Sequence, residues 1–239
     1  FHQLYESDMS ISVIMSVFNG SKFLEESLNS VLNQTMEDFD LLIVNDGSTD
    51  NSLEILKSFA DKDQRIKIYN QENRGLTKNL NFLIDKSKSK YIARLDADDI
   101  CLPERLGLQY RFLEENKKFA LVGSNAELID AEGELIKFTN VPKKHFYLKK
   151  RLLISNSIIH SSVMANKESL NSIGGYDESI PYAQDYDLWL RLLLKGKFRL
   201  ANLNERLIKL RIHESSISSS KKEFQETICL ISEHYLDPK

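Results

Sequence analysis

The sequence predicts an α/β protein in which helices flank a mostly parallel sheet. Three observations predict this class: short β-branched apolar runs, amphipathic segments of helical period between them, and polar turns directly after the runs. Strands and helices that alternate in this way form right-handed βαβ units with parallel strands. With 239 residues, of which 41% are hydrophobic and 28% charged, the chain has the composition of a folded protein with a large core.

The first half of the chain alternates the two patterns regularly. Apolar runs predict strands at residues 11–18, 41–44, 66–69 and 91–95. Apolar residues at helical spacing predict helices at 21–32, 53–59 and 76–84. Ser21 is expected to cap the first of these helices. Ligands bind such sheets at the carboxyl ends of the strands, so we expect the turns 18–20, 45–48 and 96–99 to converge on one crevice.

The second half is less regular. Its patterns predict helices at 103–115, 185–194 and 223–236, a strand at 120–123, and a hairpin that pairs 127–129 with 135–138. Residues 143–151 are basic, with aromatic residues interleaved. A solvated helix face and contact with an anionic membrane surface are both consistent with this segment.

Composition excludes several classes of function. A net charge of −3 provides no basic field for nucleic acid, so we expect no polynucleotide partner. Cys101 and Cys229 lie far apart and fit no C-x-x-C spacing, which is typical of reduced thiols. No apolar run approaches the roughly 20 residues that cross a bilayer, and residues 1–10 lack a signal-peptide pattern. We expect a cytoplasmic protein, and peripheral contact with the inner membrane surface stays open.

Three carboxylates, Asp96, Asp98 and Asp99, follow the predicted strand 91–95 within four residues. Grouping like charges at a strand end is costly unless a cation neutralises them. Hard cations such as Mn2+ and Mg2+ prefer oxygen ligands and can also bind diphosphate oxygens. The cluster therefore predicts a divalent metal and an enzyme that handles a nucleotide or another phosphorylated donor.

Two residues near the first turns have a structural and a functional interpretation. Asp46 lies in a turn that can simply cap the next helix, or it can contact a base or ribose, with Asp50 left as a structural residue. Phe18 can belong to the core or provide a face on which a base stacks.

The same ambiguity holds in the second half. Asp185 starts a predicted helix, where it can be a cap or a general base facing the crevice. Trp189 follows four residues later and can share a face with Asp185, so it can contact an acceptor sugar, although a core position is the commoner one for Trp. His213, taken alone, carries little information.

In this order, the motifs resemble those of glycosyltransferase family 2, the inverting enzymes with the GT-A fold, a Rossmann-like mixed sheet. The matching segments are 12–20, 31–35, 44–50, 73–76, 92–99, 174–177 and 184–189. The resemblance runs from about residue 10 to residue 218. It is strongest for bacterial enzymes that build lipooligosaccharide, capsule or O-antigen chains.

The resemblance implies roles for the matched positions. Phe18 and Asp46 would hold the nucleotide base, commonly uracil, and Asp96 would contact ribose or metal. Asp98 would be the main metal ligand, and His213 matches the C-terminal His that reaches metal or diphosphate in many GT-A enzymes.

On the acceptor side, the resemblance places Asp185 in the position of the catalytic base. Gln184 replaces the acidic residue that often precedes that base. Leu80 stands where many relatives carry Arg, which makes Lys78 the substitute candidate for phosphate contact. His160 falls in a loop that lines the active site in relatives, and it is a weaker acceptor-side candidate together with Gln184 and Trp189.

The sequence thus predicts one GT-A domain over residues 1–239, with a nucleotide-sugar half (about 10–120), an acceptor half (about 120–218) and a C-terminal helix (219–239). The expected reaction moves a sugar from a nucleotide donor, UDP-linked by expectation, to a hydroxyl of a bacterial glycan or lipid-linked oligosaccharide. Two alternatives stay open: an inactive sugar-binding module and a nucleotidyltransferase. The second would be expected to carry a Gly-rich phosphate loop, where this chain has only Asn19-Gly20.

Overall fold

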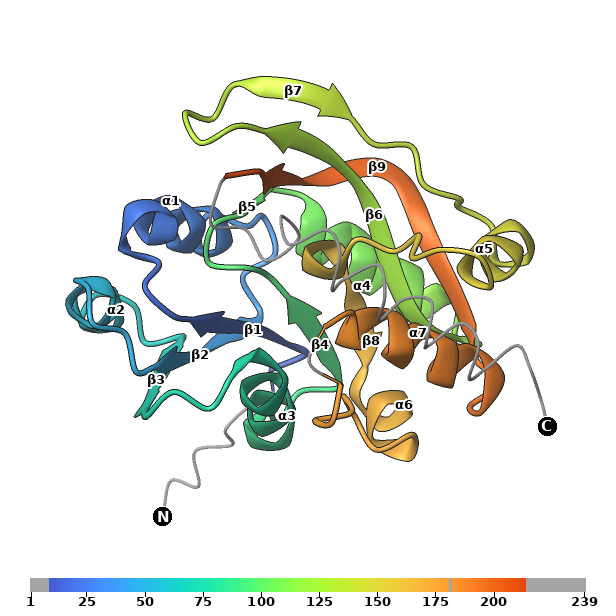
Figure 1. Cartoon of the computed structure of the whole chain (residues 1–239), viewed down its shortest axis with the longest axis horizontal. Coiled ribbons are helices and arrows are strands. Elements are labelled where there is room, and N and C mark those ends of the chain that lie inside the picture. Colours follow the sequence, from blue (N-terminus) through green and yellow to red (C-terminus); the bar gives the residue numbers. More distant parts are fainter. Residues whose placement is uncertain (1–8, 181, 214–239) are drawn as a thin grey trace, which may run out of the picture.

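A computed structural model describes residues 9–180 and 182–213 of the chain. Its centre is one mixed sheet of nine strands, with helices on both faces (Figure 1). The strand order is β3-β2-β1-β4-β8-β6-β9-β5, and β7 pairs with β6 off this path. The predicted helix at 223–236, like the C-terminal segment 219–239 as a whole, lies outside the described residues.

The first half forms the parallel part of the sheet. Four parallel strands lie side by side: β3 (Ile66–Gln71), β2 (Phe39–Asp46), β1 (Ile11–Val17) and β4 (Tyr91–Arg94). The connecting helices are α1 (Ser21–Leu32), α2 (Ser52–Ala60) and α3 (Leu76–Lys86). Every residue of β2 is buried, because helices cover both faces of this region.

The second half extends the sheet with strands in both directions. The extension contains β5 (Ile100–Cys101), β6 (Phe119–Ile129), β7 (Leu135–Phe138), β8 (Met164–Asn166) and β9 (Arg199–Arg211). β8 pairs antiparallel with both β4 and β6, whereas β6 and β9 are parallel. The helices of this half are α4 (Arg105–Glu115), α5 (His145–Leu152), the 3-10 turn η1 (His160–Ser162), α6 (Lys167–Ser172) and α7 (Gln184–Leu194).

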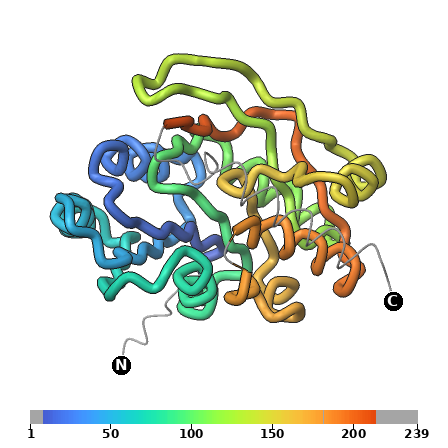
Figure 2. The backbone as a smooth tube through the Cα atoms, viewed as in Figure 1, coloured from blue at the N-terminus to red at the C-terminus, as the bar shows by residue number. Residues whose placement is uncertain are grey.

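Two hydrophobic clusters fill the space between sheet and helices. Side chains of a strand alternate between the two faces, so Ile14 of β1 belongs to one cluster and Met15 to the other. One cluster packs beneath α3, α5, α6 and α7, and the other beneath α1, α2 and α4. The backbone tube in Figure 2 shows the two halves side by side, joined through β4 and β8.

The structure confirms the predicted α/β class with a mostly parallel mixed sheet, and the first four strands and three helices lie where the patterns placed them. Two corrections concern local features. Ser21 does not cap α1: the backbone N–H of Ser21 instead donates to the Asp50 carboxylate of another turn, at 3.0 Å. The thirteen-residue strand β9 was not predicted, because polar residues and shifts of register against β6 interrupt its alternation.

Candidate active site

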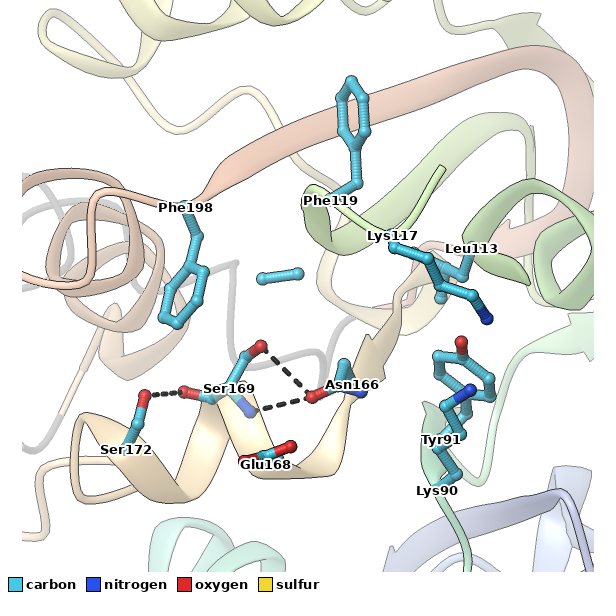
Figure 3. Close-up of a pocket in the computed structure, with 11 residues that line it drawn as sticks. Lys90, Tyr91, Leu113, Lys117, Phe119, Asn166, Glu168, Ser169, Ser172 and Phe198 are labelled. Atoms are coloured by element: carbon cyan, nitrogen blue, oxygen red, sulfur yellow. Dashed lines mark hydrogen bonds between the residues drawn. The ribbon is translucent and has the colours of Figure 1, made fainter. Parts of the chain in front are cut away.

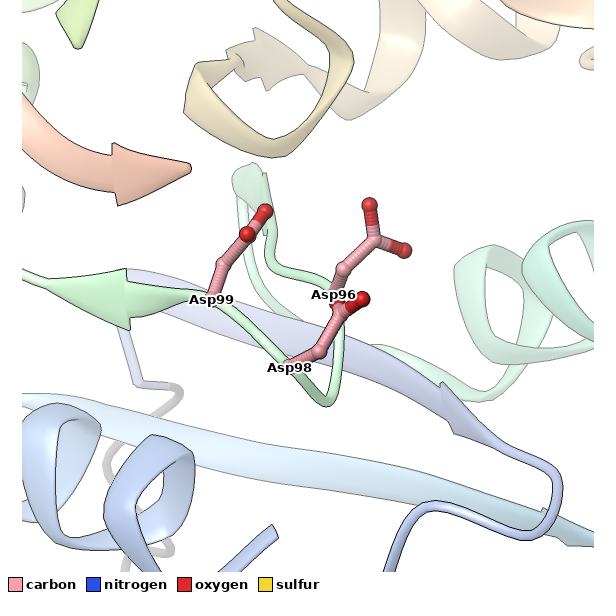
Figure 4. Close-up of side chains that lie close together, drawn as sticks. All are labelled: Asp96, Asp98 and Asp99. Atoms are coloured by element: carbon pink, nitrogen blue, oxygen red, sulfur yellow. The ribbon is translucent and has the colours of Figure 1, made fainter. Parts of the chain in front are cut away.

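The acidic loop 96–99 lies at the carboxyl end of β4. Asp96, Asp98 and Asp99 direct their carboxylates into one space (Figure 4), and one ligand atom from each lies within 4.8 Å of the others. A hydrogen bond of 3.3 Å from the Asp99 N–H to the Asp96 carbonyl closes the loop. The three carboxylates are therefore held together by the backbone of a tight turn.

Strand β9 braces this loop from the side. The backbone N–H of Arg211 donates to Oδ1 of the buried Asp99 at 2.8 Å, and the Arg211 Nε donates to the Asp98 carbonyl at 3.0 Å. The other end of the Arg211 guanidinium pairs with Glu26 of α1. β9 and α1 thus fix the loop from two directions, although they are far apart in the sequence.

His213 follows β9 directly and reaches the loop. Its Nε2 lies 2.8 Å from Oδ2 of Asp98, and its ring packs on Phe23 with 5.1 Å between the ring centroids. The resemblance assigned Asp98 and His213 to the same metal site, and the structure brings these two side chains into contact.

Asp96 forms a bidentate ion pair with Arg94, which is buried two residues earlier on β4. The pKa of Asp96 is raised to about 6: burial is the main cause, Arg94 acts in the opposite direction, and the charges of Asp98 and Asp185 add to the rise. The pKa of Asp99 is raised well above its ordinary value, chiefly by burial. Burial and the neighbouring carboxylates therefore disfavour the charged form of both side chains.

The donor set fits a divalent cation of the Mn2+ or Mg2+ type. All three carboxylates offer oxygen, the ligand atom that these ions prefer, and a bound cation would relieve the repulsion that raises the pKa of Asp96. Oδ2 of Asp99 is buried without a hydrogen-bond partner among the described residues. An acidic site with an unsatisfied buried oxygen is one that an additional positive charge would stabilise.

Asp185 lies in the first turn of α7, close enough to Asp96 for its charge to act on that carboxylate. Its Oδ2 accepts a hydrogen bond of 2.7 Å from Nδ2 of Asn156, in the loop after α5. Burial raises the pKa of Asp185, whereas the hydrogen bond from Asn156 and the charge of Arg94 lower it. A carboxylate with a raised pKa next to a cluster that can hold a metal is a suitable proton acceptor.

The three weaker acceptor-side candidates differ in position. Gln184 is the first residue of α7 and is partly exposed. His160 is partly buried, with its Nε2 2.7 Å from the hydroxyl of Tyr176, and burial holds its pKa well below the ordinary value. Trp189 is completely buried in the core beside His160. Of the two interpretations of Trp189, the structure therefore supports the core position and excludes contact with an acceptor sugar, because no surface of this side chain is accessible.

The turn 45–50 lies at the carboxyl end of β2 and is cross-linked to the turn after β1. Both oxygens of the buried Asp46 accept backbone N–H groups, from Arg74 at 2.8 Å and from Gly75 at 3.0 Å. Asp50 accepts the N–H groups of Ser21 and Ser52, each at 3.0 Å, and so caps α1 and α2 together. This confirms the structural interpretation of Asp50.

Phe18 follows β1 and is 55% exposed, which excludes the core position for this ring. Lys78 lies in the first turn of α3 and is exposed. Three residues on, Asn81 exchanges two hydrogen bonds of 2.9 Å with the backbone of Tyr176. α3 is thereby tied to the loop 174–177 of the acceptor half.

A pocket of about 340 Å3 lies away from these residues, at the amino ends of β4 and β6 (Figure 3). Phe119 and Phe198 form its apolar wall, and Lys90 and Lys117 its basic side. Both lysines pair with Glu114. This pocket contains none of the residues gathered around the acidic loop. In sheets of this kind, ligands bind at the carboxyl ends of the strands, which is the opposite edge.

This chain is similar in sequence or in fold to several known proteins. The O-antigen biosynthesis glycosyltransferase WbnJ of Escherichia coli is 38% identical over 218 residues, which make up 90% of this chain and 85% of that protein. Among solved structures, S. aureus TarS 1-349 in complex with UDP-GlcNAc superimposes with a TM-score of 0.73 at 22% identity over 93% of this chain. Mannosyltransferase PcManGT from Pyrobaculum calidifontis, in complex with GDP-Man and Mn2+, gives 0.74 at 15% identity over 96%. This chain spans 65% of each of those two chains.

The sheet order and these structural neighbours define the fold as GT-A. The family model of glycosyl transferase family 2 matches residues 12–174, more than half of the sequence. The chain therefore belongs to glycosyl transferase family 2.

Three residues around the site were not singled out from the sequence. Arg94 could have been found, because residues two apart on a strand share a face and Arg94 precedes Asp96 by two. Asn156 and Arg211 offered no local signal. Each reaches the site from a remote segment, so only the tertiary structure reveals it.

Proposed function

We propose that this chain is an inverting glycosyltransferase that moves a sugar from a nucleotide donor, a UDP-sugar by preference, to a hydroxyl of a bacterial surface glycan or glycolipid. The observation that carries the proposal is the gathering of Asp96, Asp98, His213 and Asp185 around one end of the sheet. Membership of glycosyl transferase family 2 and the likeness to an O-antigen enzyme support it.

We assign the donor to residues of about 10–120 and the acceptor to about 120–218. The exposed ring of Phe18 offers a face on which a base stacks, and Lys78 lies at the start of α3 near the same edge. Asp46 supports the base region by holding the backbone of Arg74 and Gly75. Each carboxylate oxygen keeps a second lone pair, so Asp46 can also accept from a base N–H.

A divalent cation, Mn2+ or Mg2+, is the cofactor that this proposal requires. Asp98 would be its principal ligand, with Asp96 and His213 beside it. When bound, such an ion neutralises the charge that develops on the departing nucleoside diphosphate. Arg94 holds the Asp96 carboxylate in place, and Arg211 holds the loop that presents Asp98.

Asp185 acts as the general base. Its carboxylate removes the proton from the acceptor hydroxyl while that oxygen forms a bond to the anomeric carbon and the bond to the diphosphate breaks. One displacement of this kind inverts the anomeric configuration. Asn156 orients the carboxylate through a hydrogen bond to Oδ2.

The test is the variant Asp185→Asn, which keeps the size of the side chain but cannot accept the proton. A general base contributes about 10²–10⁴-fold, so transfer of a radiolabelled sugar should fall by that factor while binding of the nucleotide donor is retained. The matched control is Asp177→Asn, in an exposed turn outside the crevice, which should transfer at the wild-type rate. Wild-type transfer by Asp185→Asn would disprove the assignment of the base.

The acceptor that best fits a family of surface-glycan enzymes is a lipid-linked oligosaccharide at the cytoplasmic face of the membrane. Within the described residues, no helix is long and apolar enough to cross a bilayer. Contact with such an acceptor would therefore need a peripheral surface in this part of the chain.

A further inference from the structure

Helix α5 exposes a face that is both aromatic and basic. Phe146 is 61% exposed and Tyr147 is 62% exposed, and Ile154, just after the helix, is 71% exposed. Lys149 and Lys150 share this side of the helix and are exposed. We call these five residues the α5 surface. Large apolar side chains that are exposed together are uncommon on a protein that contacts only water.

The opposite face of α5 anchors the helix firmly. Leu148 and Leu152 are completely buried in the core, and Nδ1 of His145 accepts the backbone N–H of Leu200 at 3.2 Å. The hydroxyl of Tyr186 on α7 donates to the Leu152 carbonyl at 2.6 Å. Because the inner face of α5 is fixed, the rings of Phe146 and Tyr147 cannot turn into the core and remain on the protein surface.

Charge distinguishes this segment from the rest of the chain. Residues 140–154 contain five lysines and arginines and no acidic residue, although the whole chain has a net charge of −3. Nζ of Lys150 lies 4.4 Å from the centroid of the Phe146 ring, so the cation and the ring form one unit. Aromatic rings with adjacent lysines are the composition that binds the interface of an anionic bilayer.

The β6–β7 hairpin is a second exposed apolar region, with Leu135, Ile136 and Phe138 each about half exposed. Its turn, however, carries Asp130, Glu132 and Glu134. An anionic surface would repel this turn, so charge favours α5 over the hairpin as the contact.

The α5 surface also lies close to the acceptor side of the proposed site. Only one residue separates Ile154 from Asn156, whose side chain donates to Asp185 at 2.7 Å. A membrane in contact with Ile154 would therefore lie near Asn156 and the Asp185 carboxylate, which we assign as the base.

We propose that the α5 surface binds an anionic phospholipid bilayer and presents the acceptor side of the crevice to glycolipids in that bilayer. This rests on the proposed function for the identity of the acceptor, whereas the lipid contact itself follows from α5 alone. The aromatic and aliphatic side chains enter the interface, and the lysines remain at the level of the headgroup phosphates.

The test is co-sedimentation of the full chain with vesicles of phosphatidylcholine alone or mixed with phosphatidylglycerol. The wild-type protein should pellet with the mixed vesicles only, and salt should weaken this binding. Lys149→Glu with Lys150→Glu should lower the partition coefficient at least about tenfold, since each basic residue near an anionic surface contributes measurably. Phe146→Ser with Tyr147→Ser should lower it by a similar factor.

Matched controls come from other exposed surfaces. Lys57→Glu with Lys62→Glu, on and after α2, makes the same change of net charge, and Leu135→Ser with Ile136→Ser removes apolar side chains from β7. Both controls should pellet like the wild type. Three results would overturn the proposal. The α2 control could lose as much binding as the α5 variants, or the β7 control could lose binding while the α5 variants keep it. The wild-type protein could also remain in the supernatant with both kinds of vesicle.

The nucleotide-binding function is measured separately. The α5 variants should unfold at the wild-type temperature and should be stabilised equally by a nucleotide sugar with Mn2+, because α5 contributes no residue to the acidic loop. A failure of that stabilisation in the wild type would contradict the proposed function and leave the vesicle result unaffected.

Discussion

Two acidic turns follow neighbouring parts of the same sheet, and the protein treats them in opposite ways. In the turn 45–50, the carboxylates of Asp46 and Asp50 accept backbone N–H groups from three other segments. Burial raises the pKa of Asp50, but hydrogen bonds from Ser52 and Ser21 outweigh it and lower that pKa to about 2. In the acidic loop 96–99, burial and mutual repulsion raise the pKa of Asp96 and Asp99.

The difference teaches how to separate structural carboxylates from functional ones in this fold. A carboxylate satisfied by backbone donors stabilises the folded chain by itself. A group of carboxylates that repel one another lowers the stability of the folded chain, and such a group indicates a functional site at which a positively charged ligand offsets the repulsion. Substitution of Asp50 or of the backbone of its turn should therefore lower the stability, and substitution in the acidic loop should lower transfer.

The largest effect is expected from Asp98→Ala. Transfer should fall at least about 10²-fold, because a metal ligand supplies several kcal/mol to the departing diphosphate and each 1.36 kcal/mol is tenfold in rate. The free energy of unfolding without metal should change by less than about 1 kcal/mol, since the lost contact with His213 is offset by relief of repulsion. Asp85→Ala, an exposed carboxylate on α3, is the control. If Asp98→Ala lowered the stability but kept the wild-type rate of transfer, the acidic loop would be structural, which contradicts the comparison.

Gly47→Ala should be the most destabilising change in the turn 45–50. Gly47 has φ +71°, and a Cβ there would lie 2.8 Å from the backbone N of Asn73. A left-handed conformation together with this contact should cost about 2–3 kcal/mol in urea unfolding. Gly133→Ala has φ +89° but no atom closer than 3.9 Å, so it should cost only about 1 kcal/mol. If both variants lowered the free energy of unfolding equally, the close approach to the backbone of Asn73 would make no contribution.

Asp50→Ala removes the shared cap of α1 and α2 and should lower the free energy of unfolding by about 1–2 kcal/mol at neutral pH. The folded pKa of Asp50, about 2, lies below its ordinary value of 3.8. Its contribution is therefore complete above pH 3.8 and is lost as the pH falls toward 2. The difference between wild type and variant should shrink over that window in chemical unfolding, and a constant difference would contradict the role of the charge.

The smallest effect is a shift in a pH profile. The hydrogen bond from Asn156 opposes the rise that burial causes in the pKa of Asp185. Asn156→Leu should therefore move the acidic limb of kcat/KM to higher pH, by about one unit for a hydrogen bond to a charged group. Asn171→Leu, on the exposed side of α6, is the control and should leave the profile unchanged. A lower kcat/KM with an unmoved limb would mean that Asn156 does not act through the pKa of Asp185.

The two halves of the chain also differ in how far the sequence predicts them. The elements up to β4 follow from local patterns, because each strand and each amphipathic helix buries its own stripe against the next one. The acidic loop could be located because it follows one of these strands, whereas the cap that Asp50 provides for α1 was not predicted, because the N–H of Ser21 reaches it from another segment. β9, by contrast, consists of polar and apolar residues whose alternation is broken by shifts of register, and only its pairing with β6 defines it.

The same distinction holds inside the site. Asp98 stands out because three carboxylates follow one strand within four residues. Asp185 does not stand out by itself, since Asp is common at a helix start, and only the order of the motifs marked it. For Trp189 the sequence left a core position and an acceptor contact open, because helical spacing from Asp185 predicts a shared face but does not show which elements cover that face. Arg211 reaches Asp99 across 112 positions of the sequence, a distance over which no local pattern carries information.

The most direct test of the central claim measures metal-dependent binding of a nucleotide by the acidic loop. Thermal unfolding is recorded for the wild type and for Asp98→Ala with UDP-sugars and Mn2+, each alone and both together. A ligand at 100 times its dissociation constant adds about 2.7 kcal/mol of stability, so the wild type should unfold at a higher temperature when both are present. The variant should lose the metal-dependent part of this gain. An equal gain in the variant, or no gain in the wild type with any nucleotide sugar, would contradict the account.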